Sequence, residues 1–209
     1  GCAPIEGPPR VVQLSSAGGD VCARSTDGTV RCWGEFTRAL SAANGTRRIG
    51  ADEAVEIPGL VAEEIAVGRI MSCARLAGGA VHCWGRSHFG FSSSGALPPT
   101  VYNLADAAQI AVGDAHACAR MRNGSVMCWG DNTLGQVGSG TRDPTTAPTL
   151  VPGVDGATQI VSGAIETCAQ VAGGRWLCWG CESSYAPECA TPHALELVDP
   201  RRGLALGLR

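Results

Sequence analysis

The chain has 209 residues and a mass of 21.4 kDa, and its 16 basic residues, all arginine, are outnumbered by 19 acidic ones. This acidic balance argues against a dedicated nucleic-acid binder, which normally carries a basic surplus. No apolar run approaches the roughly 18 residues that a membrane-spanning helix requires. With 44 % hydrophobic and 17 % charged residues, the chain can bury a core, so we expect a folded globular protein.

A short motif recurs four times along the chain, and each copy contains a cysteine pair. The tripeptide Cys-Trp-Gly begins at residues 32, 83, 128 and 178, and a further cysteine precedes each of these by ten residues. Between the two cysteines lies a turn signal such as Asp27-Gly28, and upstream of the later pairs lies an apolar run ending in glycine, such as Ile65–Gly68. Repetition at a period of about 45–51 residues is typical of propellers and related arrays.

Each copy contains several segments with the composition of β-strands. Short valine-rich runs are bounded by Gly, Pro, Asp and Asn, and no segment keeps helical periodicity over three turns. A repeat then holds an outer strand near a proline-rich connector, a strand that ends in glycine, and a cysteine-bearing hairpin. We therefore predict an all-β fold of β-propeller-type blades, each of about four antiparallel strands, with four repeats and a partial fifth.

The repeats divide the chain into six segments. An N-terminal lead is expected at residues 1–10, and a partial fifth repeat with a closing strand at 192–209. The four full repeats lie at residues 11–57, 58–97, 98–147 and 148–191.

The cysteine pairs are spaced to form cross-strand disulfides. In the first copy, a three-residue loop ending in Gly28 places Cys22 opposite Cys32 at a non-hydrogen-bonded site, where Cα atoms lie ~4.5 Å apart and a disulfide can form. Zinc is the alternative, but nine intervening residues is not zinc-ligand spacing. The predicted disulfides are Cys22–Cys32, Cys73–Cys83, Cys118–Cys128, Cys168–Cys178 and Cys181–Cys189.

The cysteine content also predicts where the protein functions. Cys178 and Cys181 form a Cys-x-x-Cys pattern that could indicate redox chemistry, but we favour structural disulfides because Cys168 already pairs with Cys178. Five disulfides predict an oxidising location, either extracellular or on a bacterial cell surface. Gly1-Cys2 resembles the junction of a bacterial lipoprotein, where the cysteine is acylated; a free cysteine is the equal alternative. We expect contact with a membrane only through lipidation at Cys2.

The third copy carries the fullest version of the motif. It contains Gly113, His116, Cys118-Ala119, Gly124, Val126, Cys128-Trp129-Gly130, Asn132, Gly135-Gln136, Gly138 and Gly140. This pattern resembles the repeat of the regulator of chromosome condensation family, and the cysteine pairs resemble its bacterial extracellular branch. The resemblance covers roughly residues 11–207 and implies propeller blades. Family functions include nucleotide exchange on a small GTPase, chromatin binding and β-lactamase inhibition, which share the recognition of another protein.

No set of residues recurs that could form a catalytic or metal centre. Of the histidines only His116 occupies a repeat-equivalent loop position, and its counterparts are not histidines, so no acid–base pair is expected. We predict a non-enzymatic extracellular protein-binding module without a cofactor and without nucleic acid as a ligand. Its expected partner-binding residues precede the first cysteine of each repeat, where loops vary on a constant frame: Asp20, Arg69, Met71, Asp114, His116 and Glu166. The alternatives are a structural subunit of a surface assembly and a secreted enzyme inhibitor.

The C-terminal segment predicts a route to self-association. Residues 198–207 match residues 154–163 at identical spacing, so a fifth copy begins there, whereas the first copy lacks an outer strand of its own. We therefore predict that residues 192–207 pair with the first repeat of another chain, giving a head-to-tail ring or fibre. Closure within one chain and a truncated seven-bladed protein are the alternatives.

Overall fold

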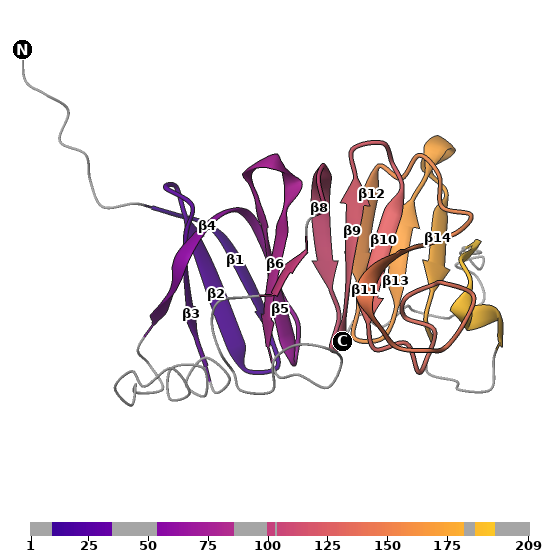
Figure 1. The fold of residues 1–209 in the computed structure, drawn as a ribbon, viewed down its shortest axis with the longest axis horizontal. Coiled ribbons are helices and arrows are strands. Elements are labelled where there is room, and N and C mark those ends of the chain that lie inside the picture. Colours follow the sequence, from indigo (N-terminus) through magenta and orange to yellow (C-terminus); the bar gives the residue numbers. More distant parts are fainter. Residues whose placement is uncertain (1–9, 35–53, 86–99, 103, 182–186, 195–209) are drawn as a thin grey trace, which may run out of the picture.

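The computed structural model describes residues 10–34, 54–85, 100–102, 104–181 and 187–194, and these form an all-β architecture (Figure 1), which confirms the predicted fold class. The strands are β1 (Val11–Ala17), β2 (Asp20–Ser25), β3 (Thr29–Trp33), β4 (Val55–Val67), β5 (Met71–Leu76), β6 (Val81–Gly85), β7 (Thr100–Tyr102), β8 (Ala107–Val112), β9 (His116–Met121), β10 (Val126–Gly130), β11 (Thr145–Leu150), β12 (Gln159–Ser162), β13 (Thr167–Gln170), β14 (Trp176–Trp179) and β15 (His193–Ala194). Three short 3₁₀ helices accompany them: η1 (Ala77–Gly79), η2 (Ala172–Gly174) and η3 (Pro187–Ala190). Within these ranges no helix is long and apolar enough to cross a membrane.

The strands form four antiparallel blades. The third and fourth blades are separate four-stranded sheets, with the strand orders β11-β10-β9-β8 and β12-β13-β14-β15. The first two blades share one seven-stranded sheet, β1 to β7, because the long strand β4 pairs with β3 through its first half and with β5 through its second half. Gly59 lies in the part of β4 that pairs with β3, where the register shifts between Glu56 and Val61, and its φ of +70° is a conformation that glycine adopts readily.

Each outer strand pairs with the hairpin that precedes it in the sequence. The first half of β4, then β7, β11 and β15, add to β3, β6, β10 and β14 respectively. The assignment of each outer strand to the following repeat was therefore wrong, because a repeating sequence does not show which neighbouring hairpin a strand joins. The predicted repeat boundaries remain predictions.

This pairing also corrects the expected use of the C-terminal segment. The first blade has an outer strand of its own, and β15 completes the fourth blade rather than the first. Residues 195–207 lie outside the described residues.

The cysteine hairpins have the predicted register. In the first blade Cys22 faces Cys32 and Ala23 faces Arg31, and the Gly28 amide donates to the Ser25 carbonyl at 2.9 Å to close the turn. All five predicted disulfides are present. The four hairpin bridges join Cα atoms 4.1 Å apart, close to the spacing of non-hydrogen-bonded antiparallel pairs.

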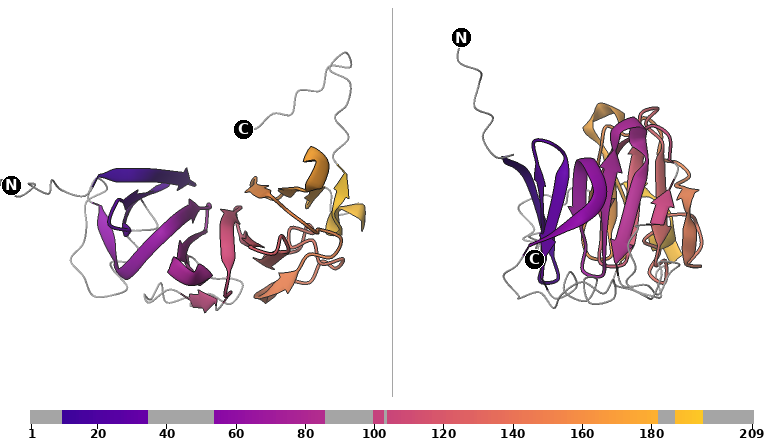
Figure 2. Two further views of the ribbon diagram at one scale, coloured as in Figure 1. Left: turned by 90° about the horizontal axis from the view of Figure 1, so that it is seen from above. Right: turned by 60° about the vertical axis from the view of Figure 1, so that its left-hand side comes forward.

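The blades stand side by side along an open arc, as the view from above shows (Figure 2, left). A hydrophobic core lies between each pair of neighbouring blades. Each core combines the disulfide of one blade with an isoleucine and the Cys-Trp-Gly tryptophan of the next; between the third and fourth blades these are Ile160 and Trp179. Trp84, Trp129 and Trp179 therefore all pack between blades.

Candidate interaction surface

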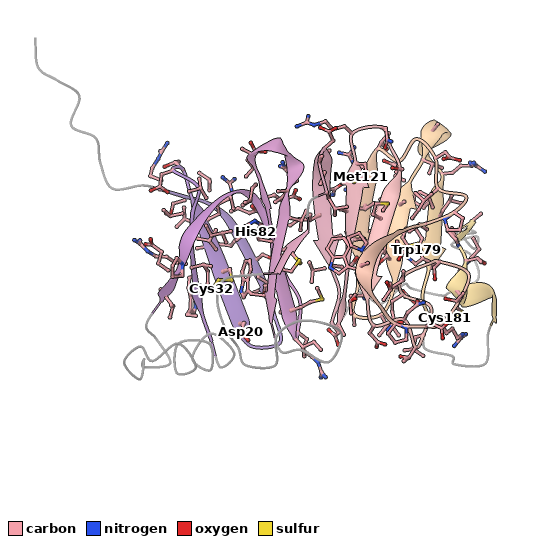
Figure 3. All side chains as sticks on the ribbon, in the orientation of Figure 1. Asp20, Cys32, His82, Met121, Trp179 and Cys181 are labelled. Atoms are coloured by element: carbon pink, nitrogen blue, oxygen red, sulfur yellow. A yellow bond between two sulfur atoms is a disulfide. The ribbon has the colours of Figure 1, made fainter. Side chains whose placement is uncertain are left out.

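The turns that lead from the inner strand of each blade into its hairpin lie next to one another at one end of the blades. The Ile70 amide donates to the Asp114 carbonyl at 3.0 Å, and the Asp114 amide donates to the Ala164 carbonyl at 2.8 Å. We call these turns, residues 18–19, 68–70, 113–115 and 163–166, the loop surface. In Figure 3 the label of Asp20 marks this end of the molecule.

Glycines allow these turns to approach one another closely. A Cβ atom on Gly68 would overlap the carbonyl oxygen of Gly113, and one on Gly113 would lie 2.7 Å from the carbonyl oxygen of Gly163. Real Cβ atoms do not come so close to backbone oxygens. The apolar runs of the second and third repeats therefore end in glycine because successive turns stack without room for a side chain.

An exposed ion pair occupies the middle of the loop surface. The Arg69 Nε and Asp114 Oδ2 atoms are 3.4 Å apart, and their side chains are 65 % and 38 % exposed. These residues hold the same repeat position, four residues before the first cysteine, where the first and fourth blades have Gly18 and Ala164. The loop surface therefore presents a neutral, a basic, an acidic and a neutral position in order along the arc.

Three of the six predicted binding residues are buried instead. Asp20, Met71 and His116 begin β2, β5 and β9, and all three are shielded from solvent. Met71 belongs to the core between the second and third blades. Met71 and His116 contribute to junctions between blades, and none of the three side chains is available to an external partner in this structure.

Their counterpart in the fourth blade is exposed. Glu166 occupies the same repeat position, but no following blade covers it within the part of the chain that the structure describes. The six predicted residues thus fall into an exposed Arg69–Asp114 pair on the loop surface, a buried set of three, and the exposed Glu166, which lies on the loop surface in the fourth blade.

His116 has an unusual environment for a histidine. Its Nε2 atom lies 2.8 Å from the Thr167 hydroxyl of the next blade, and that hydroxyl also lies 3.0 Å from the Ser162 hydroxyl. Complete burial lowers the pKa of His116 to about 4, although the Asp131 carboxylate acts in the opposite direction. The imidazole is therefore neutral at pH 7, and it serves as a hydrogen-bonding contact between blades.

A second set of residues, which the sequence analysis did not select, ties each inner strand to the next one. The Gln13 side chain donates to the Ile65 carbonyl at 2.8 Å and accepts from the Ile65 amide at 3.0 Å. Gln109 repeats both bonds with Ile160, at 2.8 and 2.9 Å. Between them in the sequence, Glu64 accepts from the Ile110 amide at 3.2 Å.

An arginine of the neighbouring hairpin strand braces each of these side chains. Arg24, Arg75 and Arg120 donate through Nε to Gln13, Glu64 and Gln109 at 3.2, 3.0 and 3.4 Å. We call Gln13, Glu64 and Gln109 the clamp residues. The signal that could have identified them is a polar residue recurring directly before the apolar Leu or Ile of each inner strand.

The family-like loop of the third repeat is also structural. Asn132 is fully buried; it accepts from the Val137 amide at 2.9 Å and donates to the Thr141 carbonyl at 2.9 Å. The Trp179 Nε1 atom donates to the Gln136 carbonyl at 2.9 Å, which fastens this loop to the fourth blade. Among the described residues no group of three or more His, Cys, Asp or Glu side chains could hold a metal ion.

Comparison with known proteins identifies the repeat. Two models described as the regulator of chromosome condensation (RCC1) repeat match residues 107–136 and 123–178. No curated protein sequence matches the chain significantly.

Solved structures with the same fold extend the match over nearly the whole chain. Prp20p from Saccharomyces cerevisiae is 19 % identical, with a TM-score of 0.75 over 93 % of this chain and 52 % of that one. Human WBSCR16 is 16 % identical, with a TM-score of 0.73 over 92 % of this chain and 55 % of that one. The chain thus spans about half the length of these propeller proteins. Residues 107–178 thus match the RCC1 repeat, and the blades of the chain have the fold of Prp20p.

Proposed function

We propose that the chain is a non-enzymatic, extracellular protein-binding module that contacts its partner through the loop surface. The proposal rests on the repeat position that lies four residues before the first cysteine of each repeat. Its occupants differ in chemistry, and the exposed Arg69–Asp114 pair lies on backbone hydrogen bonds that join neighbouring blades. Varied, exposed loops on a rigid scaffold are the usual place for binding residues.

Proteins with the same fold support a protein as the class of ligand. The Prp20p structure was described together with its binding to Gsp1p and histones, and yeast RCC1 (Prp20) was solved bound to Kap60. Because this chain spans about half of those proteins, only the class of partner is carried over, and the partner's identity is left to experiment.

The disulfides support the extracellular part of the proposal. Every blade has a bridge across its central hairpin, and a fifth joins Cys181 to Cys189. Such a density of bridges indicates folding in an oxidising compartment. Cys2 lies outside the described residues, and its acylation on a bacterial surface is part of the proposal; mass spectrometry of the native protein would detect the attached lipid.

The binding test compares two exposed ion pairs. The double variant Arg69→Ala/Asp114→Ala removes the pair on the loop surface, and Arg31→Ala/Glu56→Ala removes a pair of similar exposure on the first blade, with a 3.1 Å contact. Each protein is immobilised and exposed to the secreted proteins of the source organism, and the affinity of any partner captured by the unmodified chain is then measured with each variant.

The loop-surface variant should bind the partner at least about tenfold more weakly, since truncating an important contact costs more than about 1.4 kcal/mol. The control should bind normally, and both should unfold within about 0.5 kcal/mol of the unmodified chain. Equal binding by all three proteins, or a loss that accompanies unfolding, would contradict the proposal.

A further inference from the structure

The three methionines of the chain have two different environments. Met71 is 2 % exposed and belongs to the core between the second and third blades. Met121, the last residue of β9, and Met127 of β10 also pack against this core, but both remain partly exposed. One buried and two accessible thioethers can therefore be compared within a single junction.

The register of the third hairpin places the two accessible methionines close together. Met127 lies opposite Ala119, and Met121 is two residues from Ala119 on the same strand. Successive residues of a strand face opposite sides of a sheet, so both side chains lie on the side of the blade that faces the second blade, as Ala119 does. Long side chains at such diagonal positions are within reach of each other. We call Met121 and Met127 the methionine pair.

The methionine pair lines a pocket of about 450 Å³ at the end of the blades opposite the loop surface. β9 begins at His116, next to the loop surface, and ends at Met121, whose label marks this opposite end in Figure 3. The buried Leu104 adds a further apolar side chain to the pocket lining. Because both methionines are partly exposed, small solutes can reach them while the chain is folded.

The pocket also contains hydrogen-bond donors that suit an oxidised methionine. The Asn123 Oδ1 atom accepts from the Ser125 amide at 2.9 Å and from the Ser125 hydroxyl at 2.8 Å, which orients the Asn123 amide and leaves its two Nδ2 hydrogens for other acceptors. Arg122 is exposed, and its Nε atom lies 3.8 Å from Asp106 Oδ1, so the guanidinium has further donors to offer. A sulfoxide oxygen is an acceptor that these groups can bind.

We propose that Met121 and Met127 are a site of oxidation by hydrogen peroxide, and that the folded chain retains both sulfoxides while Met71 stays reduced. A lone pair of the thioether sulfur attacks one peroxide oxygen, an S–O bond forms and the O–O bond breaks. The departing hydroxide takes the proton of the transferred oxygen and leaves as water. The sulfur is oxidised by two electrons and the peroxide is reduced. Methionine sulfoxide reductases reverse this modification.

Burial determines the expected order of reaction. Peroxide must contact the sulfur atom, so susceptibility follows exposure. Met71 can react only when the core between the second and third blades opens, and a core opens far more rarely than the surface around it. The methionine pair needs no such opening. Since all three side chains pack on the same core, a general loosening of this junction would expose them together and remove the difference.

The test treats the full disulfide-bonded chain with hydrogen peroxide, once folded and once in guanidinium. After removal of the peroxide and reduction, cleavage before aspartate separates Met71, in residues 52–105, from the methionine pair, in residues 114–130. Tandem mass spectrometry then locates each added oxygen. In the folded chain each member of the pair should be oxidised at least about tenfold faster than Met71. In guanidinium the three rates should agree within about twofold, because every sulfur is then exposed.

Two variants provide matched controls, and both are swaps of similar volume that a core tolerates. Folded Met71→Leu should gain two oxygen atoms at the rate of the unmodified chain, whereas folded Met121→Leu/Met127→Leu should gain none at Met71 in the same time. The unmodified chain oxidised at both residues should still unfold cooperatively, with a Tm within about 5 °C of the reduced chain. A member of the pair that reacts as slowly as Met71, rapid oxidation of Met71 in the folded chain, or loss of the cooperative transition after oxidation would each overturn the proposal.

Discussion

The junction between the second and third blades and the junction between the third and fourth blades use the same positions with different chemistry. The former has the clamp residue Glu64, which forms an ion pair with Arg75 at 3.0 Å, and both side chains are mostly shielded from solvent. The latter has the neutral clamp residue Gln109 and places His116 against Thr167. The position of His116 is occupied by Met71 in the second blade.

The difference shows that one strand position can join neighbouring blades through either a carboxylate or an amide side chain. A carboxylate can only accept hydrogen bonds, so Glu64 binds the Ile110 amide, whereas Gln109 binds both the amide and the carbonyl of Ile160. Burial alone would lower the pKa of Arg75, but hydrogen bonds to Glu64 and Glu63 outweigh it and raise that pKa. The two junctions should therefore respond differently to acid and to salt.

The largest expected effect comes from removing the buried tryptophan that each of the two junctions contains. Trp129→Ala and Trp179→Ala each empty a fully buried site, so each should lower the free energy of unfolding by about 3–5 kcal/mol. Leu150→Ala, at an exposed position of β11, should cost less than about 1 kcal/mol. Guanidinium unfolding measures all three, and a tryptophan variant no less stable than Leu150→Ala would contradict this account of the cores.

Acid should weaken the junction that contains His116. Because burial lowers the pKa of His116 from 6.5 to about 4 in the folded chain, the unfolded chain binds more protons between these values. The contribution of the neutral imidazole is therefore complete above about pH 6.5 and is lost as the pH falls toward 4, by about 3 kcal/mol in total.

The variant His116→Met gives the third blade the residue of the second and isolates this effect. Its free energy of unfolding should change less between pH 7 and pH 4 than that of the unmodified chain, since every other titrating group is retained. Urea unfolding at several pH values measures the difference, and parallel pH profiles for the two proteins would refute the assignment to His116.

The hairpins could be predicted from the sequence because their information is local. Nine residues between paired cysteines, with glycine at the end of the turn, define the register that places Cys22 opposite Cys32. The pairing of the outer strands depends on tertiary structure, since a strand between two hairpins can join either one. The sequence also could not separate the buried His116 from the exposed Arg69, because their repeat positions, two and four residues before the first cysteine, are close together and only the arrangement of the blades buries one of them.

The clamp residues illustrate a signal that was present in the sequence but was not used. Gln13, Glu64 and Gln109 recur at one repeat position, and an arginine recurs after the alanine of each facing strand. These side chains form hydrogen bonds with the backbone of the next blade. Only the three-dimensional arrangement shows that the next blade is close enough for these bonds. A recurring polar residue within an apolar strand is therefore a sign of a contact between repeats.

A smaller effect is expected when the clamp between the third and fourth blades is shortened. Gln109→Ala leaves the Ile160 amide and carbonyl without their side-chain partner, which should cost about 1–3 kcal/mol. Gln109→Glu keeps the bond to the amide, as Glu64 does, and should cost less. Unfolding free energies rank the two variants, and a larger loss for Gln109→Glu would show that this junction does not tolerate the charge found in its neighbour.

The smallest effect on stability is expected from the converse change, Glu64→Gln. It removes the ion pair with Arg75 but provides a donor for the Ile110 carbonyl, so the net change should be below about 1 kcal/mol. The response to salt should also change, because salt weakens even a partly buried ion pair to a small extent, and the variant has no charge at residue 64. We expect the unmodified chain to lose more stability than Glu64→Gln when urea unfolding is repeated at high salt. Arg75 retains Glu63 as a second carboxylate partner in both proteins, so the comparison reports on the clamp position itself. An equal salt response would mean that Glu64 acts only as a hydrogen-bond acceptor for Ile110, and that the two junctions are electrostatically equivalent.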